Sequence, residues 1–220
     1  MPLPQAVRRL APDRLRYSVR VRALAVGSGL VPPRTMHSPA ESALLAELAR
    51  DRRTAVEIGV YEGSSAVVFC DALTAEAELH LIDPFFDESG WAMRPGWHGT
   101  PAATRLAVRR RCREGGPDVR WHIARSQDVG REWHGPEVDV VFVDGDHSPE
   151  ACGDDWDVWH PHVRPGGVVA FHDARLGAPD GTGSPGPTSV VDRLFRGSVT
   201  PGGWRLTDEV DTTVVVRRER

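Results

Sequence analysis

Short apolar runs alternate along this chain with segments whose apolar residues recur at helical spacing. The runs that predict strands are 54–58, 79–82, 119–124, 139–143 and 168–171. The segments that predict helices are 38–50, 64–73, 100–114, 150–160 and 190–195, and two further runs, 204–206 and 212–217, predict a closing hairpin. Strands that are apolar throughout and separated by helices are typical of an α/β fold with a mostly parallel sheet.

The first 35 residues are arginine-rich and only weakly periodic, with a helix predicted near 5–25 and a break at Pro32-Pro33. After the break, Ser38 is followed by Pro39 and, three residues on, by Glu41, the pattern of a capping box at a helix start. We therefore divide the chain into an N-terminal helical extension or lid, 1–35, and one main domain, 36–220.

Two long segments rich in glycine and proline, 84–99 and 174–188, follow directly on predicted strand ends. Long loops in compact domains are usually functional. In open α/β sheets, ligands bind outside the carboxyl ends of the strands. We expect both loops to surround a substrate.

Composition excludes several classes of protein. The formal net charge is −4 and the pI about 6.1, without the basic surplus of a nucleic-acid or membrane-surface partner. Two local groups of arginines are interpreted as solvated helix faces, with a binding patch as the alternative: Arg8, Arg9, Arg14, Arg16, Arg20, Arg22 and Arg109, Arg110, Arg111, Arg113. No apolar run approaches the length of a membrane span.

Three cysteines, Cys70, Cys112 and Cys152, lie at long spacings. An odd number without a short motif indicates neither a disulfide framework nor a zinc site. We expect reduced thiols and a cytoplasmic protein.

The strongest chemical signal is the stretch 56–65. Glu57 ends a strand, Gly59 and Gly63 follow it, and a helix begins at Ser64. Glycines allow a tight turn and close approach to a ligand, and the helix start presents free N–H groups. The G-x-x-x-G spacing differs from the G-x-G-x-x-G of dinucleotide sites, and a tight turn without a ligand is the alternative.

Acidic and imidazole groups end three further strands. Asp83 stands where such residues accept hydrogen bonds from ribose hydroxyls. Asp144 ends one later strand, and His172 and Asp173 end the next, so chain order predicts that the three meet. Converging carboxylates repel one another unless a cation such as Mg²⁺ or Mn²⁺ lies between them. The alternative is that Asp144 caps a helix and His172 packs behind it.

The motifs EIGVYEGSSA, HLIDPF, VDVVFVDGDHSPE and RPGGVVAFHDA, in this order, resemble those of class I S-adenosylmethionine (SAM)-dependent methyltransferases. The resemblance covers about 36–175 and is greatest to bacterial metal-dependent O-methyltransferases of the catechol, cephalosporin-tailoring and macrolide-sugar kinds. It implies a Rossmann-like, seven-stranded, mostly parallel sheet with helices on both faces and a C-terminal antiparallel hairpin.

The resemblance also implies roles for single residues. The set that would bind SAM comprises Glu57, Gly59, Tyr61, Gly63, Ser65, Asp83, Ser126 and Asp144, with Asp128 competing with Ser126 for the adenine. The metal ligands would be Asp144, His172 and Asp173, although relatives usually carry Asp or Glu where this chain has His172. His147 stands where catechol-type relatives place a basic lysine.

These roles predict O-methylation of a small-molecule hydroxyl, with Asp144 and His147 catalytic and His147 as general base. Packing of His147 on Glu150 is the alternative for that residue. The sequence leaves three alternative functions: a glycosyltransferase using Asp144-Gly145-Asp146 as a D-x-D motif, a nicotinamide-dependent reductase, and a non-catalytic module. A homodimer is possible, and no nucleic-acid or membrane partner is expected.

Overall fold

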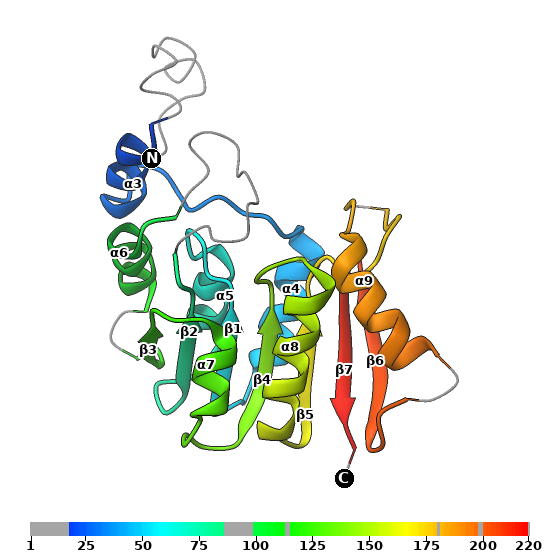
Figure 1. Ribbon diagram of the computed structural model, residues 1–220. Coiled ribbons are helices and arrows are strands. Elements are labelled where there is room, and N and C mark those ends of the chain that lie inside the picture. Colours follow the sequence, from blue (N-terminus) through cyan, green and yellow to red (C-terminus); the bar gives the residue numbers. More distant parts are fainter. Residues whose placement is uncertain (1–17, 86–98, 113–114, 180, 198–199, 220) are drawn as a thin grey trace.

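The computed structural model describes residues 18–85, 99–112, 115–179, 181–197 and 200–219. Its centre is a seven-stranded sheet in the order β3-β2-β1-β4-β5-β7-β6 (Figure 1). The first five of these strands are parallel, and β7 is antiparallel to both of its neighbours. The strands are β1 (Thr54–Ile58), β2 (Glu78–Ile82), β3 (Asp118–His122), β4 (Val138–Val143), β5 (Val163–Phe171), β6 (Trp204–Val210) and β7 (Thr213–Arg218). The predicted fold class is confirmed.

Helices cover both faces of the sheet. They are α3 (Val19–Gly27), α4 (Pro39–Ala49), α5 (Ser64–Ala72), α6 (Pro101–Arg111), α7 (Ser126–Arg131), α8 (Pro149–Trp159) and α9 (Pro185–Val191), with a 3-10 turn η1 (His160–His162) and a π-helical turn η2 (Asp192–Arg196). On one face Trp156 and Trp159 of α8 pack with Val190 of α9 on the sheet. On the other face, Leu45 of α4 and Phe69 of α5 are completely buried. Strands β1 and β4, in the middle of the sheet, are buried throughout because helices cover both faces there.

Most predicted elements are confirmed to within a few residues. The capping box at Ser38 and Glu41 forms as expected and begins α4. Three predictions were wrong in detail. Helix α7 was missed, β5 begins at Val163 rather than 168, and the helix expected at 190–195 already begins at Pro185. Of the helix expected near 5–25, the structure describes α3, and residues 1–17 lie outside the described part.

The expectation of reduced thiols was wrong for two of the three cysteines. Cys70 on α5 and Cys112 at the end of α6 form a disulfide, while Cys152 is free and buried. Sequence spacing gave no hint of this, since 42 residues separate the two. They meet because α5 and α6 pack side by side on the same face of the sheet.

No helix among the described residues is both long and apolar enough to cross a membrane.

Replacing Cys112 by serine should lower the free energy of unfolding by about 2–4 kcal/mol, because the unfolded chain without the cross-link has more conformational entropy. Denaturant unfolding of the oxidised protein measures this difference. Reductant should bring the wild type to the stability of the Cys112→Ser variant, and it should lower the stability of a Cys152→Ala control by the same amount as it lowers that of the wild type. An unfolding midpoint of the wild type that ignores reductant would contradict the disulfide.

Candidate active site

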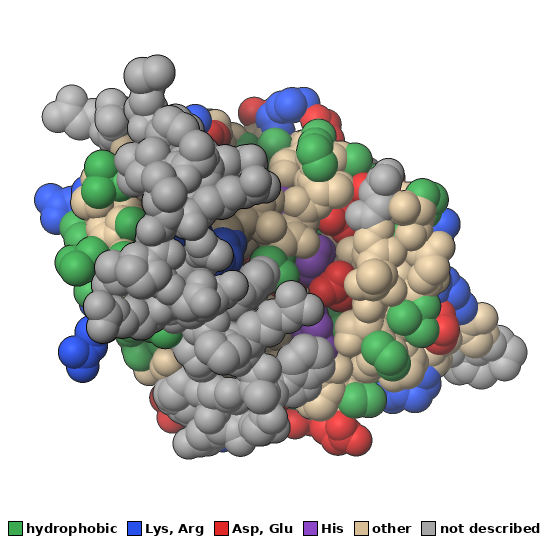
Figure 2. All heavy atoms as spheres, turned by 90° about the horizontal axis from the view of Figure 1, so that it is seen from above, with side chains coloured by type: hydrophobic (Ala, Val, Ile, Leu, Met, Phe, Trp, Pro, Cys, Tyr) green, Lys and Arg blue, Asp and Glu red, His purple; other side chains and the backbone are tan. Residues whose placement is uncertain are grey.

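The predicted site residues lie along the carboxyl edge of the parallel strands. Strands β2, β1, β4 and β5 are neighbours, and they end beside Asp83, Glu57, Asp144 and His172 respectively. Figure 2 views the molecule from this edge, where histidine and acidic side chains gather near the middle of the face. The prediction that β4 and β5 are adjacent, and bring their terminal residues together, is confirmed.

The glycine loop after β1 is shaped by close packing. Gly59 has φ of +86°, and a Cβ there would lie 2.0 Å from the carbonyl oxygen of Asp144. Gly63, with φ of +87°, is the N-cap of α5. Tyr61 also adopts a positive φ, 51°, which is costly for a residue with a side chain. The loop therefore lies directly against the end of β4, and glycine is required at both positions.

Asp83 fixes the conformation of this loop. Its Oδ2 accepts the backbone N–H groups of Val60 at 2.9 Å and Tyr61 at 2.8 Å, and Oδ1 accepts that of Phe85 at 2.6 Å. Burial raises the pKa of Asp83, and these three hydrogen bonds oppose that shift. The ribose contact expected of Asp83 stays a prediction. What the hydrogen bonds show is that Asp83 holds the backbone of the glycine loop in place.

Glu57 carries a buried acceptor without a donor. The side chain is fully buried, and the Ser65 hydroxyl donates to Oε1 at 2.5 Å. Oε2 has no hydrogen-bond partner among the described residues. Burial raises the pKa of this carboxyl well above its usual range. An unsatisfied buried oxygen costs stability, so a ligand that supplies a donor would fit here.

A second cluster, which we call the acidic triad, consists of Asp144, His147 and Asp173. One ligand atom from each lies within 4.8 Å of the others. Nε2 of His147 is 3.5 Å from Asp144 Oδ1, and Nδ1 is 3.8 Å from Asp173 Oδ2. Burial lowers the pKa of His147, but the hydrogen bond and charge of Asp144 outweigh it, so that the pKa is raised. Carboxylate oxygens and one imidazole are a donor set that suits Mg²⁺ or Mn²⁺.

The backbone that carries His147 is held from two sides. Ser148 caps α8, accepting the Ala151 N–H, and Asp146 accepts the Ser148 N–H at 2.8 Å. Gly186 of α9 packs so closely that a Cβ there would lie 1.9 Å from the His147 carbonyl oxygen. The loop between β4 and α8 is therefore fixed by its own cap and by α9.

His172 lies behind the acidic triad, with only 2% of the residue exposed. Its Nδ1 is 2.9 Å from Asp144 Oδ1, and its Nε2 faces Glu41 Oε2 at 3.7 Å. Burial opposes protonation, but the charge of Asp144 and its hydrogen bond raise the pKa of His172 to about 11. Both nitrogens are thus directed at carboxylates. The structure brings Asp144 and Asp173 into one set of possible metal ligands with His147, whereas the role predicted for His172 as a ligand stays a prediction.

Glu41 completes this arrangement from α4. Its Oε1 accepts the backbone N–H and hydroxyl of Thr212 at 3.0 and 2.6 Å and the hydroxyl of Thr213 at 3.0 Å. Burial opposes ionisation of Glu41, but the nearby His172 and the hydrogen bonds from Thr212 outweigh it, so that the pKa of Glu41 is lowered. The sequence marked Glu41 only as part of a capping box, because its partners lie about 170 residues away.

Of the two candidates for the adenine contact, only Ser126 is buried. Its hydroxyl donates to Asp155 of α8, and Trp159 donates to its carbonyl oxygen at 3.2 Å. Asp128 is largely exposed and pairs with Arg131 at 3.3 Å. Burial raises the pKa of Asp155 to about 7. Sequence reasoning missed Asp155, which lies in the middle of an amphipathic helix with no motif around it.

Sequence reasoning also missed a cluster of charges that joins the N-terminal segment to the glycine loop. Arg22 of α3 donates to both oxygens of Glu62, at 3.0 and 2.6 Å. The backbone N–H of Arg34 donates to Glu62 at 2.7 Å, and its guanidinium reaches the Tyr61 hydroxyl at 2.9 Å. Glu62 is only 3% exposed. The one signal for it in the sequence was an acidic residue between the two loop glycines.

Comparison with known proteins agrees with this geometry. The family described as "Methyltransferase domain" matches residues 56–174. A protein of Mycobacterium sp. (strain JLS) named "Putative O-methyltransferase" is 27% identical over 195 residues, which cover 85% of this chain and 77% of that protein.

Solved structures show the same fold. The O-methyltransferase TomG from Streptomyces achromogenes, involved in tomaymycin synthesis and solved with SAM, superimposes with a TM-score of 0.60 at 23% identity, covering 92% of this chain and 90% of TomG. The O-methyltransferase NovP gives a TM-score of 0.62 at 17% identity, covering 91% and 89%. These matches argue against the glycosyltransferase and reductase alternatives. The chain belongs to the methyltransferase-domain family and is a class I SAM-dependent methyltransferase.

Proposed function

We propose that the protein transfers the methyl group of SAM to a hydroxyl of a small molecule, and that a divalent cation assists. The observation that carries this proposal is the acidic triad, Asp144, His147 and Asp173, next to the glycine loop at one edge of the sheet. The triad offers both a proton acceptor and oxygen ligands within a few ångströms. The names of TomG, NovP and the mycobacterial relative support oxygen as the methylated atom.

SAM fits the residues of the glycine loop. The unpartnered Oε2 of Glu57 suits a cationic donor such as the methionine ammonium, and Ser65 lies beside it. The start of α5 at Gly63 offers free N–H groups to a carboxylate. Asp83 would bind the ribose, Ser126 would lie beside the adenine, and Asp144 would border the site through its backbone contact with Gly59. Bound there, SAM supplies an electrophilic methyl group.

The cation would be held by Asp144 and Asp173. Both carboxylates are partly exposed, at 19% and 28% of the side chain, so that solvent or substrate can reach them. His172 donates to Asp144 from behind and would orient it, in the manner of outer-shell partners at metal sites. A bound Mg²⁺ or Mn²⁺ would lower the pKa of a substrate hydroxyl.

His147 would accept the proton of the acceptor hydroxyl. Its two nitrogens face Asp144 and Asp173, which orient the imidazole and stabilise it once protonated. The caps around α8 and the contact with Gly186 hold the ring in place, so most of the rate enhancement would come from positioning and electrostatics.

The N-terminal segment, predicted as an extension or lid over 1–35, would act through Arg22 and Arg34 on the glycine loop. We further propose that the protein acts in the cytoplasm on a specialised metabolite or a sugar, without a nucleic-acid or membrane partner. The formal net charge of −4 supports a partner other than nucleic acid.

Asp144→Asn should reduce kcat by a factor on the order of 10²–10⁴, because the triad loses the charge that orients His147 and attracts the cation. The dissociation constant of SAM should change only a few-fold, as measured by calorimetry. Turnover is measured against a panel of hydroxyl-bearing small molecules with Mg²⁺, Mn²⁺ or a chelator. Asp146→Asn is the matched control, because it removes an exposed neighbouring charge while the asparagine oxygen can still accept the Ser148 N–H that holds the loop. Equal losses in both variants would point back to a D-x-D motif and contradict the proposal.

His147→Gln should lower kcat by a similar factor while Mn²⁺ still binds, because the two carboxylates remain. Calorimetric titration of Mn²⁺ into this variant separates the role of base from that of ligand. If Mn²⁺ binding is lost together with turnover, His147 is a metal ligand, and the base must be sought elsewhere.

Glu62→Gln should raise the dissociation constant of SAM by about tenfold, since a glutamine cannot hold both arginines and the loop is freed from the N-terminal segment. The kcat at saturating SAM should change little. Glu47→Gln, which removes an exposed pair with Arg50, is the control and should leave both constants unchanged. Unaltered SAM affinity in Glu62→Gln would exclude the positioning role.

A further inference from the structure

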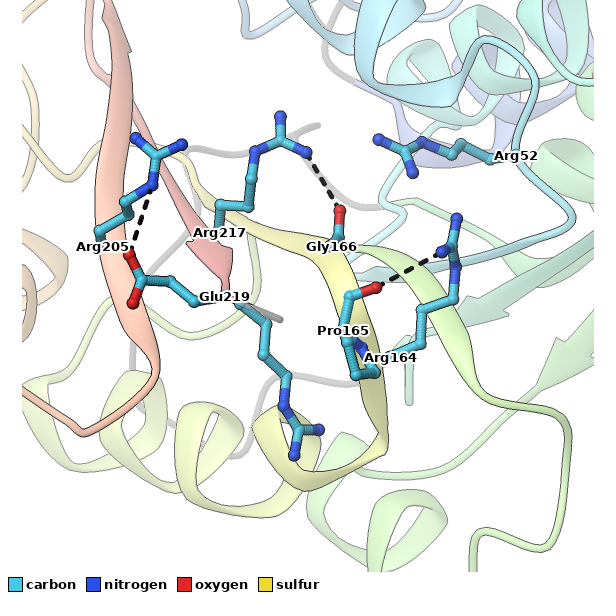
Figure 3. Close-up of a pocket in the computed structure, with 8 residues that line it drawn as sticks. Arg52, Arg164, Pro165, Gly166, Arg205, Arg217 and Glu219 are labelled. Atoms are coloured by element: carbon cyan, nitrogen blue, oxygen red, sulfur yellow. Dashed lines mark hydrogen bonds and ion pairs between the residues drawn. The ribbon is translucent and has the colours of Figure 1, made fainter.

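A pocket lined by arginines lies at the amino edge of the sheet, opposite the candidate active site (Figure 3). Its volume is about 500 Å³, within the usual range of small-molecule sites. The lining residues come from the α4–β1 connection, the start of β5, the start of β6 and the end of β7: Arg52, Arg164, Pro165, Gly166, Arg205, Arg217, Arg218 and Glu219. Gly166 stands six residues before His172 along β5, so about 20 Å separate the two sites.

The arginines greatly outnumber their counter-charges. Arg164 pairs with Asp139, which lies 3.9 Å from Arg52 as well, and Arg205 pairs with Glu219 at 3.6 Å. Arg217 donates to the Gly166 carbonyl oxygen at 3.0 Å, and Arg218 donates to backbone carbonyls too. Neither has a carboxylate within 4 Å among the described residues. Five guanidinium groups thus share two carboxylates.

Three of these guanidinium groups converge. In Figure 3 the side chains of Arg52 and Arg217 point toward one another beside Gly166, with Arg164 next to Arg52. Only 19% of the Arg52 side chain is exposed. Its pKa is lowered, first by burial and then by the charges of Arg164 and Arg217, while Asp139 and more weakly Asp51 oppose that shift. Like charges held together in a partly buried pocket repel one another, and an anion between them would relieve that repulsion.

We propose that this pocket binds a phosphate-bearing small molecule at a site separate from methyl transfer. Guanidinium groups form paired hydrogen bonds with phosphate oxygens, and several of them around one cavity suit an anion of two or more charges. The modest volume of the pocket and the lining carboxylate of Glu219 favour a small ligand. A nucleic acid would require an extended basic face, whereas this chain has a net charge of −4.

The test is calorimetric titration of inorganic pyrophosphate at low ionic strength. The protein is first saturated with S-adenosylhomocysteine, without divalent cations, so that the carboxyl edge does not take up the probe. We expect binding to the wild type. Arg217→Gln and Arg205→Glu should each weaken it at least tenfold. Arg205 is exposed, so that variant remains informative if the loss of the Arg217 contact with Gly166 impairs folding.

Arg111→Ala is the matched control, because it removes an exposed arginine that pairs with Asp71 and does not line the pocket. Pyrophosphate should bind this variant as it binds the wild type. Absence of binding to the wild type, or equal affinity in all variants, would overturn the proposal. A single-stranded oligonucleotide that binds more tightly than pyrophosphate and depends on the same arginines would replace it with a nucleic-acid site.

Discussion

The charged pair between His172 and Asp144 is the interaction on which the carboxyl edge of this methyltransferase depends. His172 is buried between Asp144 and Glu41, and these carboxylates raise its pKa, so that β4, β5 and α4 meet at one imidazole. Burying a charge is unfavourable unless partners compensate it. Here two carboxylates do so, and Thr212 and Thr213 bind the far side of Glu41. The turn of the antiparallel hairpin is thereby joined to the site by hydrogen bonds.

This pair also influences the negative charge that the acidic triad presents. Without a positive group behind it, Asp144 would repel Asp173 and would be drawn toward solvent. With His172 donating to Oδ1, Asp144 keeps its charge, its pKa is held below the usual range, and it still faces His147. A cation placed between the triad carboxylates would therefore meet less negative charge than in a site built from acidic residues alone. For that reason metal affinity and turnover have to be measured separately.

The glycine loop and the acidic triad are held against each other, because Gly59 packs on the carbonyl group of Asp144 and Asp83 accepts hydrogen bonds from the loop backbone. Two further sets of contacts restrain the loop and the helices next to it. Arg22 and Arg34 clamp Glu62 within the loop, and the Cys70–Cys112 disulfide fixes α5 to α6. Thr104 of α6 adds a hydrogen bond to the Tyr61 carbonyl at 2.7 Å. Strain at Tyr61, a non-glycine residue with positive φ, is balanced by these contacts.

The sequence was sufficient to predict features that depend on adjacent residues. It failed to predict contacts between residues that lie far apart along the chain. Strands β1 and β4, the glycines of the loop and the cap of α4 follow from spacing and periodicity, because each is decided by a few adjacent residues. Glu62, Glu41 and the disulfide follow from packing between elements 28 to 171 residues apart, for which a single chain gives no pattern. His172 has both a feature that the sequence predicts and one that it does not. Its place at the end of β5 was predictable, but its orientation depends on Glu41, which no local motif connects with it. The sequence therefore places His172 beside Asp144 and Asp173, whereas its hydrogen bond with Asp144 and its approach to Glu41 depend on how β5 packs with β4 and α4.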